Sequence, residues 1–205
     1  MIDLYAAPTS NGLRAKIMLE ECEFAYTQHT VDLANGAQLE SRYLSLNPMG
    51  LIPTIVDLEG PDGNPLILSQ SIAIMIYLSE KSNRFMPKNV SENPVFWRDI
   101  MNIATDMTGV LMAVLAVGRM ANPHLPTMDE FGARFKRYLK YWDGVLADSQ
   151  FTAADEVTIA DFAFYPVLYR AKAVTPQYTG GCDNVERWYS EMDARSGVQK
   201  GVDFG

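Results

Sequence analysis

The sequence predicts an α/β domain followed by an all-helical domain, and three observations support this prediction. Short strand patterns alternate with helical patterns over residues 1–81. Residues 82–93 are polar, contain one proline and have no hydrophobic periodicity, which is typical of a linker. Beyond this linker, residues 94–205 contain helical patterns and no convincing strand. We therefore expect two domains joined by a linker.

In the first domain we expect a strand, a helix, a strand, an irregular segment, two strands and a helix, in that order. The first strand is "IDLY", in which Ile2 and Leu4 alternate with their neighbours. In the helix that follows, residues at i, i+3, i+4 and i+7 share one face and are expected to point into a core: Ala15, Met18, Leu19 and Cys22. This places Cys22 in the core rather than in a reactive site.

The other elements of this domain follow from turn chemistry and connections. Residues 26–31 form the second strand, which should lie parallel to the first because a helix connects the two. Residues 53–59 and 65–68 flank the turn sequence "GPDGN" and should form a hairpin. A helix over 69–81 completes the domain.

In the helical domain, cap signals mark where helices begin. After the break "ANPHLP", Thr127 and Glu130 have the spacing of a capping box, and Thr158 and Asp161 have it again. The expected helices are 94–120, 127–146, 157–174 and 184–197.

Composition excludes several classes of partner and site. The net charge of −8 argues against nucleic acid or an anionic membrane as the main partner. The longest unbroken apolar run, residues 110–117, is far shorter than the roughly 20 residues that span a bilayer, and no signal-peptide pattern is present. Two distant cysteines form no disulfide framework, and the two histidines lack partners at ligand spacing for a metal. We expect a cytoplasmic protein without a metal.

Four motifs, taken together, resemble the cytosolic glutathione S-transferases in the same order along the chain: "PTSNG", "NPMGLIPTIVD", "LSQSIAIMIYL" and "VTIADF". "APTSNG" with "DLANGAQ" is most similar to the nu-class bacterial enzymes, which are related to a yeast prion-forming nitrogen regulator and act as disulfide reductases. The resemblance implies a thioredoxin-like N-terminal domain that binds glutathione as co-substrate. It also implies a helical domain that supplies the second-substrate pocket, and a homodimer.

The same resemblance implies which residues bind glutathione. Ile52 would offer its backbone to the cysteinyl unit, ahead of a cis bond to Pro53; a trans proline that opens a strand is the plain alternative. Gln70 and Ser71 would hold the γ-glutamyl end at a helix N-terminus, where Ser69 or Ser71 could equally act as a cap.

At the glycyl end of glutathione, Gln38 matches a glutamine of the nu-like enzymes. Arg134 matches an arginine that reaches glutathione in those relatives, although an exposed helical arginine is also common. Two residues depart from the pattern: Leu51 stands where many relatives have lysine, and Gln70 replaces a charged glutamate. Leu51 cannot reach the glycyl carboxylate, and a hydrogen bond to the neutral Gln70 is weaker than one to a charged group, so both departures should lower the affinity for glutathione.

Thr9, Ser10 and Asn11 are residue types that cap helices, and a cap does not exclude chemistry. A helix N-terminus lowers the pKa of a nearby thiol, and a side-chain donor stabilises the thiolate further. In the nu-like enzymes a threonine and an asparagine have this role, which would fall to Thr9 and Asn11. Ser10 is a rival, and the order of preference is Asn11, Thr9, Ser10. No cysteine lies here, so the reactive thiol would be that of glutathione.

The sequence is compatible with two kinds of function, an enzyme and a non-catalytic protein. The first is a glutathione-dependent transferase or disulfide-bond reductase, in which the bound thiolate attacks a small apolar electrophile or a disulfide. The alternative is a non-catalytic binding or regulatory protein with the same fold, which Leu51 and Gln70 favour.

Overall fold

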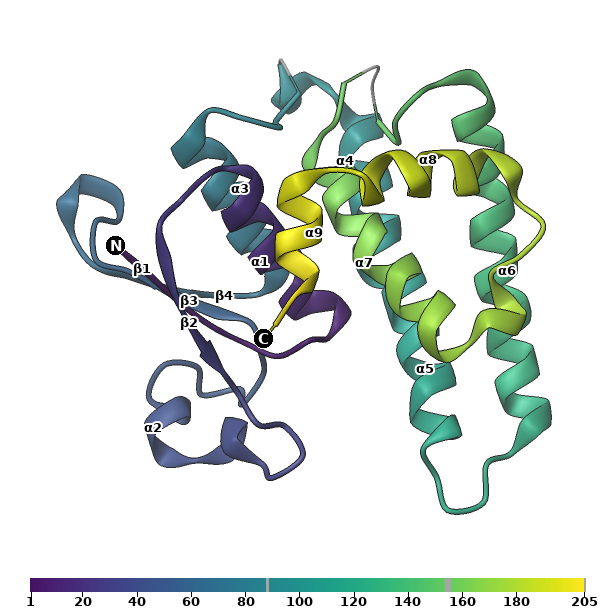
Figure 1. The fold of residues 1–205 in the computed structure, drawn as a ribbon, viewed down its shortest axis with the longest axis horizontal. Helices are drawn as coiled ribbons and strands as arrows, with labels where there is room; N and C mark the ends of the chain where they lie inside the picture. Colours follow the sequence, from purple (N-terminus) through teal and green to yellow (C-terminus); the bar gives the residue numbers. More distant parts are fainter. Residues whose placement is uncertain (88, 154–155, 205) are drawn as a thin grey trace. The chain divides into compact units, whose positions relative to one another are not determined.

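The computed structural model describes residues 1–87, 89–153 and 156–204. The chain forms two compact units (Figure 1). One consists of Met1–Met86 together with Ala194–Gly205, and the other of Pro87–Asp193.

The first unit contains a four-stranded mixed sheet with the order β2-β1-β3-β4 (Figure 1). Its strands are β1 (Ile2–Ala6), β2 (Tyr26–Thr30), β3 (Thr54–Asp57) and β4 (Leu66–Ser69). β1 and β2 are parallel, as predicted from the helix between them. β3 pairs antiparallel with both β1 and β4, and the predicted hairpin is confirmed, with a 3-10 turn at Pro61–Gly63.

Helices α1 (Ser10–Glu21) and α3 (Ser71–Ser82) pack against each other and against the sheet. The face predicted for α1 is confirmed, because the four residues at its helical spacing are all buried: Ala15, Met18, Leu19 and Cys22. Along β1, Ile2, Leu4 and Ala6 are buried, and Tyr5 alternates with them. Side chains on a strand point to opposite faces in turn, so Tyr5 points to the opposite face of the sheet.

A short helical segment lies against the Tyr5 side of the sheet. It consists of a 3-10 turn at Ala37–Leu39 and α2 (Ser41–Leu44). Tyr43 of α2 is fully packed, and its ring meets Tyr5 edge-on at a centroid distance of 6.4 Å. Neither helical turn was predicted, because residues 37–44 contain no complete amphipathic repeat.

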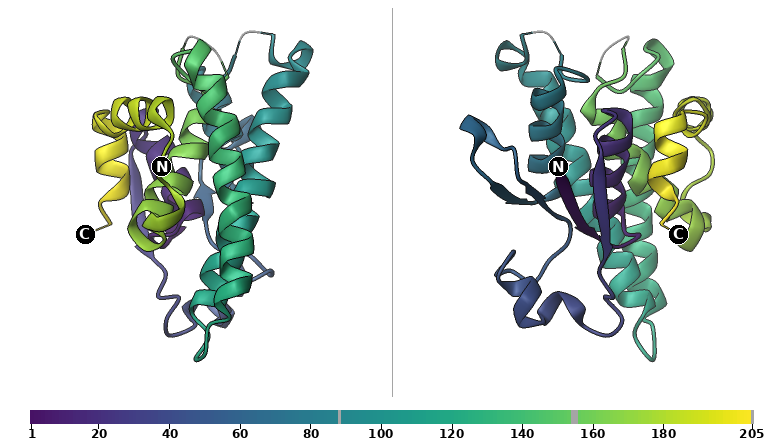
Figure 2. Two further views of the ribbon diagram at one scale, coloured as in Figure 1. Left: turned by 90° about the vertical axis from the view of Figure 1, so that its right-hand side faces the viewer. Right: turned by 60° about the vertical axis from the view of Figure 1, so that its left-hand side comes forward.

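Helix α9 (Ser196–Val202) lies alongside α1, far from it in the sequence (Figures 1 and 2). Gly201 permits the close approach, since a Cβ there would lie 2.4 Å from Cγ1 of Ile17. Arg195 forms two hydrogen bonds with Glu21, of 2.9 and 2.5 Å. Residues 196–202, predicted to belong to the helical region, thus pack on α1 of the first unit.

The second unit is helical and contains α4 (Pro94–Met101), α5 (Thr108–Gly118), α6 (Leu125–Asp148), α7 (Ile159–Val174) and α8 (Asp183–Asp193). Two 3-10 turns, Val90–Glu92 and Pro176–Tyr178, accompany them. The predicted single helix 184–197 was wrong: α8 ends at Asp193, and the extended backbone of Arg195 separates it from α9.

Two further predictions in this unit need correction. The expected helix 94–120 is interrupted by a π-helical segment, Asn102–Met107, that joins α4 to α5. The helix expected at 127 begins at Leu125, because His124 is its N-cap and accepts a hydrogen bond from the Thr127 N–H. The predicted capping box of Thr158 and Asp161 is confirmed.

Asp161 is also the polar centre of this unit's core. Its carboxylate is buried and accepts hydrogen bonds from the backbone and hydroxyl of Thr152, from those of Thr158 and from the Trp188 indole. Burial raises the pKa of Asp161, and these hydrogen bonds oppose the rise. The buried rings of Trp142, Phe164 and Trp188 pack in a row beside it.

Among the described residues, one helical stretch, Pro94–Gly118, is by length and composition able to cross a membrane. Core helices of soluble proteins pass the same test, so one such helix is weak evidence for a span. Here the side chains of Ile100, Ile103, Met107 and Leu111 are buried, whereas 33% of the most apolar 18-residue window as a whole is buried.

Candidate functional site

The candidate site begins where β1 ends and α1 starts. Thr9 has an extended backbone and is the N-cap of α1, and its hydroxyl accepts a hydrogen bond of 3.2 Å from the Gly12 N–H. Only glycine fits at position 12, because a Cβ would lie 2.0 Å from the carbonyl oxygen of Ala7. Of the three polar residues, Thr9 therefore serves as the cap, Ser10 is buried and Asn11 is half-buried.

Asn11 and Ser71 meet at the N-termini of α1 and α3. The Ser71 hydroxyl donates to Oδ1 of Asn11 at 3.3 Å, and a guanidinium nitrogen of Arg14 donates to the same oxygen at 2.7 Å. The same Arg14 nitrogen lies 3.5 Å from Ser71 Oγ. With Oδ1 facing two donors, the Nδ2 donor of Asn11 lies on the other side of the amide group.

Arg14 is the functional residue that sequence analysis missed. Its side chain is 1% exposed, which is rare for arginine. Burial lowers the pKa of Arg14 to about 9, so the group still carries its charge at neutral pH. The available signal was the spacing: Asn11 and Arg14 are three residues apart and therefore neighbours on a helix surface.

The junction between β4 and α3 has an unusual backbone. Gln70 has φ 77° and ψ 113°, a backbone conformation that residues other than glycine rarely adopt. Such a conformation costs on the order of 1–3 kcal/mol and is common at functional sites. Gln70 precedes α3 without a side-chain cap bond, so neither Ser69 nor Ser71 acts as the cap. Its side chain is exposed, next to the buried Ser71.

The bond between Ile52 and Pro53 is cis, as predicted. The preceding loop is fixed by Leu51, whose carbonyl oxygen accepts hydrogen bonds from Tyr43 Oη at 2.7 Å and Asn47 Nδ2 at 2.6 Å. The Leu51 side chain itself is 53% exposed.

Gln38 lies on the 3-10 turn near that loop. A Cβ at Gly50 would be 3.3 Å from the backbone oxygen of Gln38, so the turn and the loop are in close contact. The side-chain Oε1 of Gln38 is buried, and no hydrogen-bond partner for it exists among the described residues. A buried acceptor without a partner costs about 1–3 kcal/mol.

Arg134 is the one predicted site residue in the second unit. It lies on α6, half-exposed, with Glu130 at 3.5 Å and the Phe131 ring at 5.7 Å, both on its own helix. Its predicted contact with glutathione stays a prediction.

Neither cysteine of the chain is an activated thiol. Cys22 and Cys182 are both free and buried, and burial raises the pKa of each. Raised values keep both thiols protonated at neutral pH. Within residues 1–87, 89–153 and 156–204, no three side chains of the metal-binding types are grouped.

This geometry can bind and activate a thiol that comes from outside the chain. At the start of α1, the Arg14 guanidinium donates to the Asn11 amide oxygen, and the Asn11 amide donor and the helix N-terminus lie in the same turn. Each of them favours the thiolate over the thiol.

Comparison with known proteins supports the same class. Residues 10–81 match the glutathione S-transferase N-terminal domain, and residues 126–191 match the glutathione S-transferase C-terminal domain. Disulfide-bond oxidoreductase YfcG of Escherichia coli (strain K12) is 32% identical over 177 residues, which cover 81% of this chain and 78% of the relative.

Two solved structures are similar over nearly the whole chain. A glutathione transferase from Burkholderia graminis, with two glutathione molecules bound per subunit, has a TM-score of 0.89 at 30% identity, covering 99% of this chain and 88% of that one. A glutathione transferase from Pseudomonas putida, with one glutathione disulfide bound per subunit, has a TM-score of 0.86 at 30% identity, covering 99% and 91%.

The fold is thus a thioredoxin-like sheet with its helices, followed by a helical domain, and the protein is an enzyme of the glutathione-dependent class. The chain belongs to the glutathione S-transferase family.

Proposed function

We propose that this family member binds glutathione on its first unit and reduces small disulfides with it. The observation that supports this most directly is the Asn11–Arg14–Ser71 cluster, since it presents an amide donor beside a buried cation at a helix N-terminus. The similarity to a disulfide-bond oxidoreductase and to structures that hold two glutathione molecules or glutathione disulfide supports the choice of reaction.

In this proposal each group has one task. Asn11 Nδ2 donates to the sulfur of glutathione and lowers its pKa, and Thr9 is the second candidate donor. Arg14 fixes the orientation of the Asn11 amide and adds positive charge. The γ-glutamyl end binds at Gln70 and Ser71, the cysteinyl backbone binds at Ile52 ahead of Pro53, and Gln38 contacts the glycyl end.

The chemistry balances over two exchanges. The bound thiolate attacks one sulfur of the disulfide, which forms a mixed disulfide with glutathione and releases a thiolate that takes up a proton. A second glutathione thiolate attacks the glutathione sulfur of that mixed disulfide and releases the other half of the substrate. Two glutathione molecules are oxidised to glutathione disulfide, and the substrate gains two electrons and two protons.

Three further expectations belong to this proposal. The second substrate binds against the helical unit, where Arg134 contributes to glutathione binding, and the enzyme is a homodimer. The location in the cytoplasm stays a prediction. Sedimentation velocity checks the dimer, which should have twice the mass of the chain.

The test is a titration with glutathione, followed by thiolate ultraviolet absorbance over a pH series. Saturable binding with a thiol pKa well below the free value of about 8.5–9 is expected. Turnover of a small dialkyl disulfide, with glutathione disulfide as the product, then distinguishes reduction from conjugation to an aryl halide. Conjugation without disulfide turnover would refute reduction. An absence of binding at millimolar glutathione would contradict the proposed binding site.

A further inference from the structure

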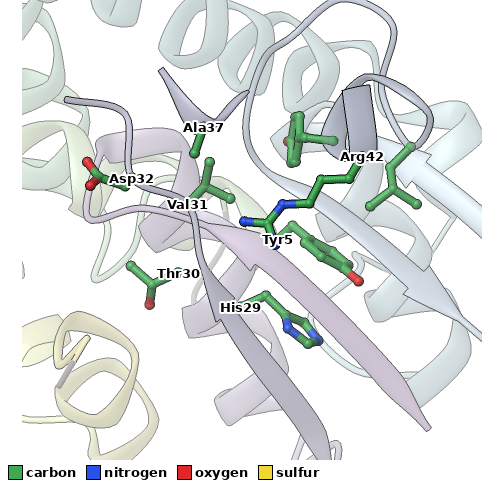
Figure 3. Close-up of a pocket in the computed structure, with 9 residues that line it drawn as sticks. Tyr5, His29, Thr30, Val31, Asp32, Ala37 and Arg42 are labelled. Carbon is green, nitrogen blue, oxygen red and sulfur yellow. The ribbon is translucent and has the colours of Figure 1, made fainter. Parts of the chain in front are cut away.

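A cavity of about 470 Å³ lies in the first unit between the sheet and α2 (Figure 3). Strands β1 and β2 form its floor, and α2 and the chain after β2 form its walls: Tyr5, His29, Thr30, Val31, Asp32, Ala37, Arg42, Tyr43 and Leu46. None of these residues is among those that the proposed glutathione reaction uses. The volume lies within the range of about 300–1,000 Å³ that is typical of small-molecule sites.

The floor of the cavity is a fixed aromatic surface. Tyr5 and His29 are paired across the parallel ladder, and their rings are stacked at 4.5 Å with an angle of 13°. His29 Nε2 is 2.8 Å from Oδ1 of Asp3, which holds the imidazole in place. The Tyr43 ring stands edge-on to Tyr5, and the Tyr43 hydroxyl donates to the Leu51 carbonyl. Each ring covers one face of the other, so an aromatic ligand ring can contact the pair only at ring edges or at an outer face, in the edge-to-face or offset arrangements that aromatic rings favour.

The remaining lining is apolar on one side and charged at two separate places. Val31, Ala37 and Leu46 supply the apolar wall. In Figure 3 the Arg42 side chain and the Asp32 carboxylate lie on opposite sides of Val31. The two charges are therefore at different ends of the cavity.

Arg42 is available for an anion. Its ion pair with Glu40, at 3.1 Å, joins two exposed side chains (84% and 54%), and pairs of this kind contribute little. A carboxylate can replace Glu40 with two parallel hydrogen bonds. Asp32 repels a second negative charge: the Asn35 side chain, together with the Asn35 and Ala34 N–H groups, lowers the pKa of Asp32 and keeps it ionised.

We infer that this cavity binds a small, flat aromatic monocarboxylate, with the ring on the Tyr5–His29 surface and the carboxylate on Arg42. Its lining shares no residue with the proposed glutathione site, and the inference does not depend on the proposed reaction. An aromatic dicarboxylate is disfavoured, because its second carboxylate would approach Asp32.

The probe is 2-naphthoate, followed by proton NMR of the two histidine rings, His29 and His124. His124 belongs to the second unit and serves as an internal control, and a His124→Asn variant assigns the signals. Naphthoate is expected to shift the His29 signals saturably and to leave those of His124 unchanged. The neutral 2-naphthamide and the dianion 2,6-naphthalenedicarboxylate are each expected to bind at least fivefold more weakly.

Calorimetry with variants tests whether the charge of Arg42 binds the ligand carboxylate and whether the ligand occupies this cavity. Arg42→Gln should lower the affinity for naphthoate at least fivefold and leave the affinity for naphthamide unchanged. Arg84→Gln is the matched control, because Arg84 also pairs with a nearby glutamate, Glu23 at 3.1 Å. This substitution should change neither of the two affinities. Saturating glutathione should not displace naphthoate. The inference is overturned if His29 signals do not move, if Arg42→Gln has no effect, or if glutathione competes with naphthoate.

Discussion

The guanidinium group of Arg14 donates a hydrogen bond of 2.7 Å to the side-chain oxygen of Asn11, one turn earlier on α1. An arginine has donors and no acceptor, so this contact determines which end of the Asn11 amide faces the protein. The amide nitrogen faces the other way, as a donor with a fixed direction.

Replacing Asn11 should impair catalysis without affecting the fold. In Asn11→Ala the donor is lost, so the pKa of bound glutathione rises and turnover falls by about 10- to 100-fold. Asn11→Asp keeps an oxygen for Arg14 but removes the amide donor, and it should be impaired to a similar degree. Steady-state kinetics and the thiolate titration measure both effects. Unchanged turnover in both variants would assign the donor role to Thr9 or Ser10.

Arg14→Met removes the guanidinium and keeps an apolar side chain of similar length. We expect kcat to fall about tenfold and the thiol pKa to rise, with a smaller change in KM, because the Asn11 amide loses its fixed orientation. Arg14→Lys retains the charge and a donor and should recover part of the activity. A purely structural role for Arg14 would lower the melting temperature and leave the thiol pKa of the folded enzyme as it was.

Leu51→Lys should increase the affinity for glutathione. The side chain at position 51 is 53% exposed, so a lysine is accommodated there and can approach the glycyl carboxylate. The gain should be about threefold in Kd, equivalent to about 0.7 kcal/mol, as for an exposed ion pair. Leu58→Lys is the matched control, because Leu58 is 52% exposed and lies after β3. Calorimetry compares the two, and equal changes would mean that net charge alone is responsible.

The ion pair between Asp57 and Lys81, 2.5 Å apart, should make stability depend on pH. Burial alone would raise the pKa of Asp57, but hydrogen bonds from Lys81, Tyr77 and the Glu59 N–H lower it below its usual value. An aspartate whose pKa is lower in the folded than in the unfolded protein stabilises the fold. This stabilisation is complete at pH values above the unfolded-state pKa of about 3.9, and it is lost as the pH falls through the folded-state pKa.

Lys81→Met should therefore destabilise the protein by about 1–3 kcal/mol at pH 7. Denaturant unfolding at pH 7 and at successively lower pH measures the difference, which should shrink as Asp57 becomes protonated. Lys140→Met is a control: Lys140 also pairs with an aspartate, Asp143, but its side chain is 74% exposed and the distance is 3.5 Å. A difference that is constant with pH would contradict this account.

The sheet and most helices could be predicted from sequence because their signals are local. Alternation in "IDLY", the turn "GPDGN" and the pair Thr158–Asp161 each specify one element within a few residues. The exceptions are places where a distant or unexpected partner decides. His124 replaces Thr127 as a cap, and α9 is separated from α8 where Arg195 pairs with Glu21.

The candidate site was predicted only in part. Thr9, Asn11 and Ser71 follow from motifs, and the structure places Asn11 and Ser71 in contact. Arg14 was missed, because burial of a charged side chain depends on packing between α1 and α3 rather than on residue type. The Tyr5–His29 surface was missed for a related reason, since strand register places the two rings together.

The packing of α9 on α1 has a consequence for the order in which the protein matures. On the ribosome, the α/β unit emerges first and the helical residues 87–193 follow before the segment that contains α9 is made. Until then, the surface around Ile17 and Glu21 is exposed to solvent. A nascent chain halted before residue 194 would present this surface to chaperones and proteases, and release of the remaining residues would cover it.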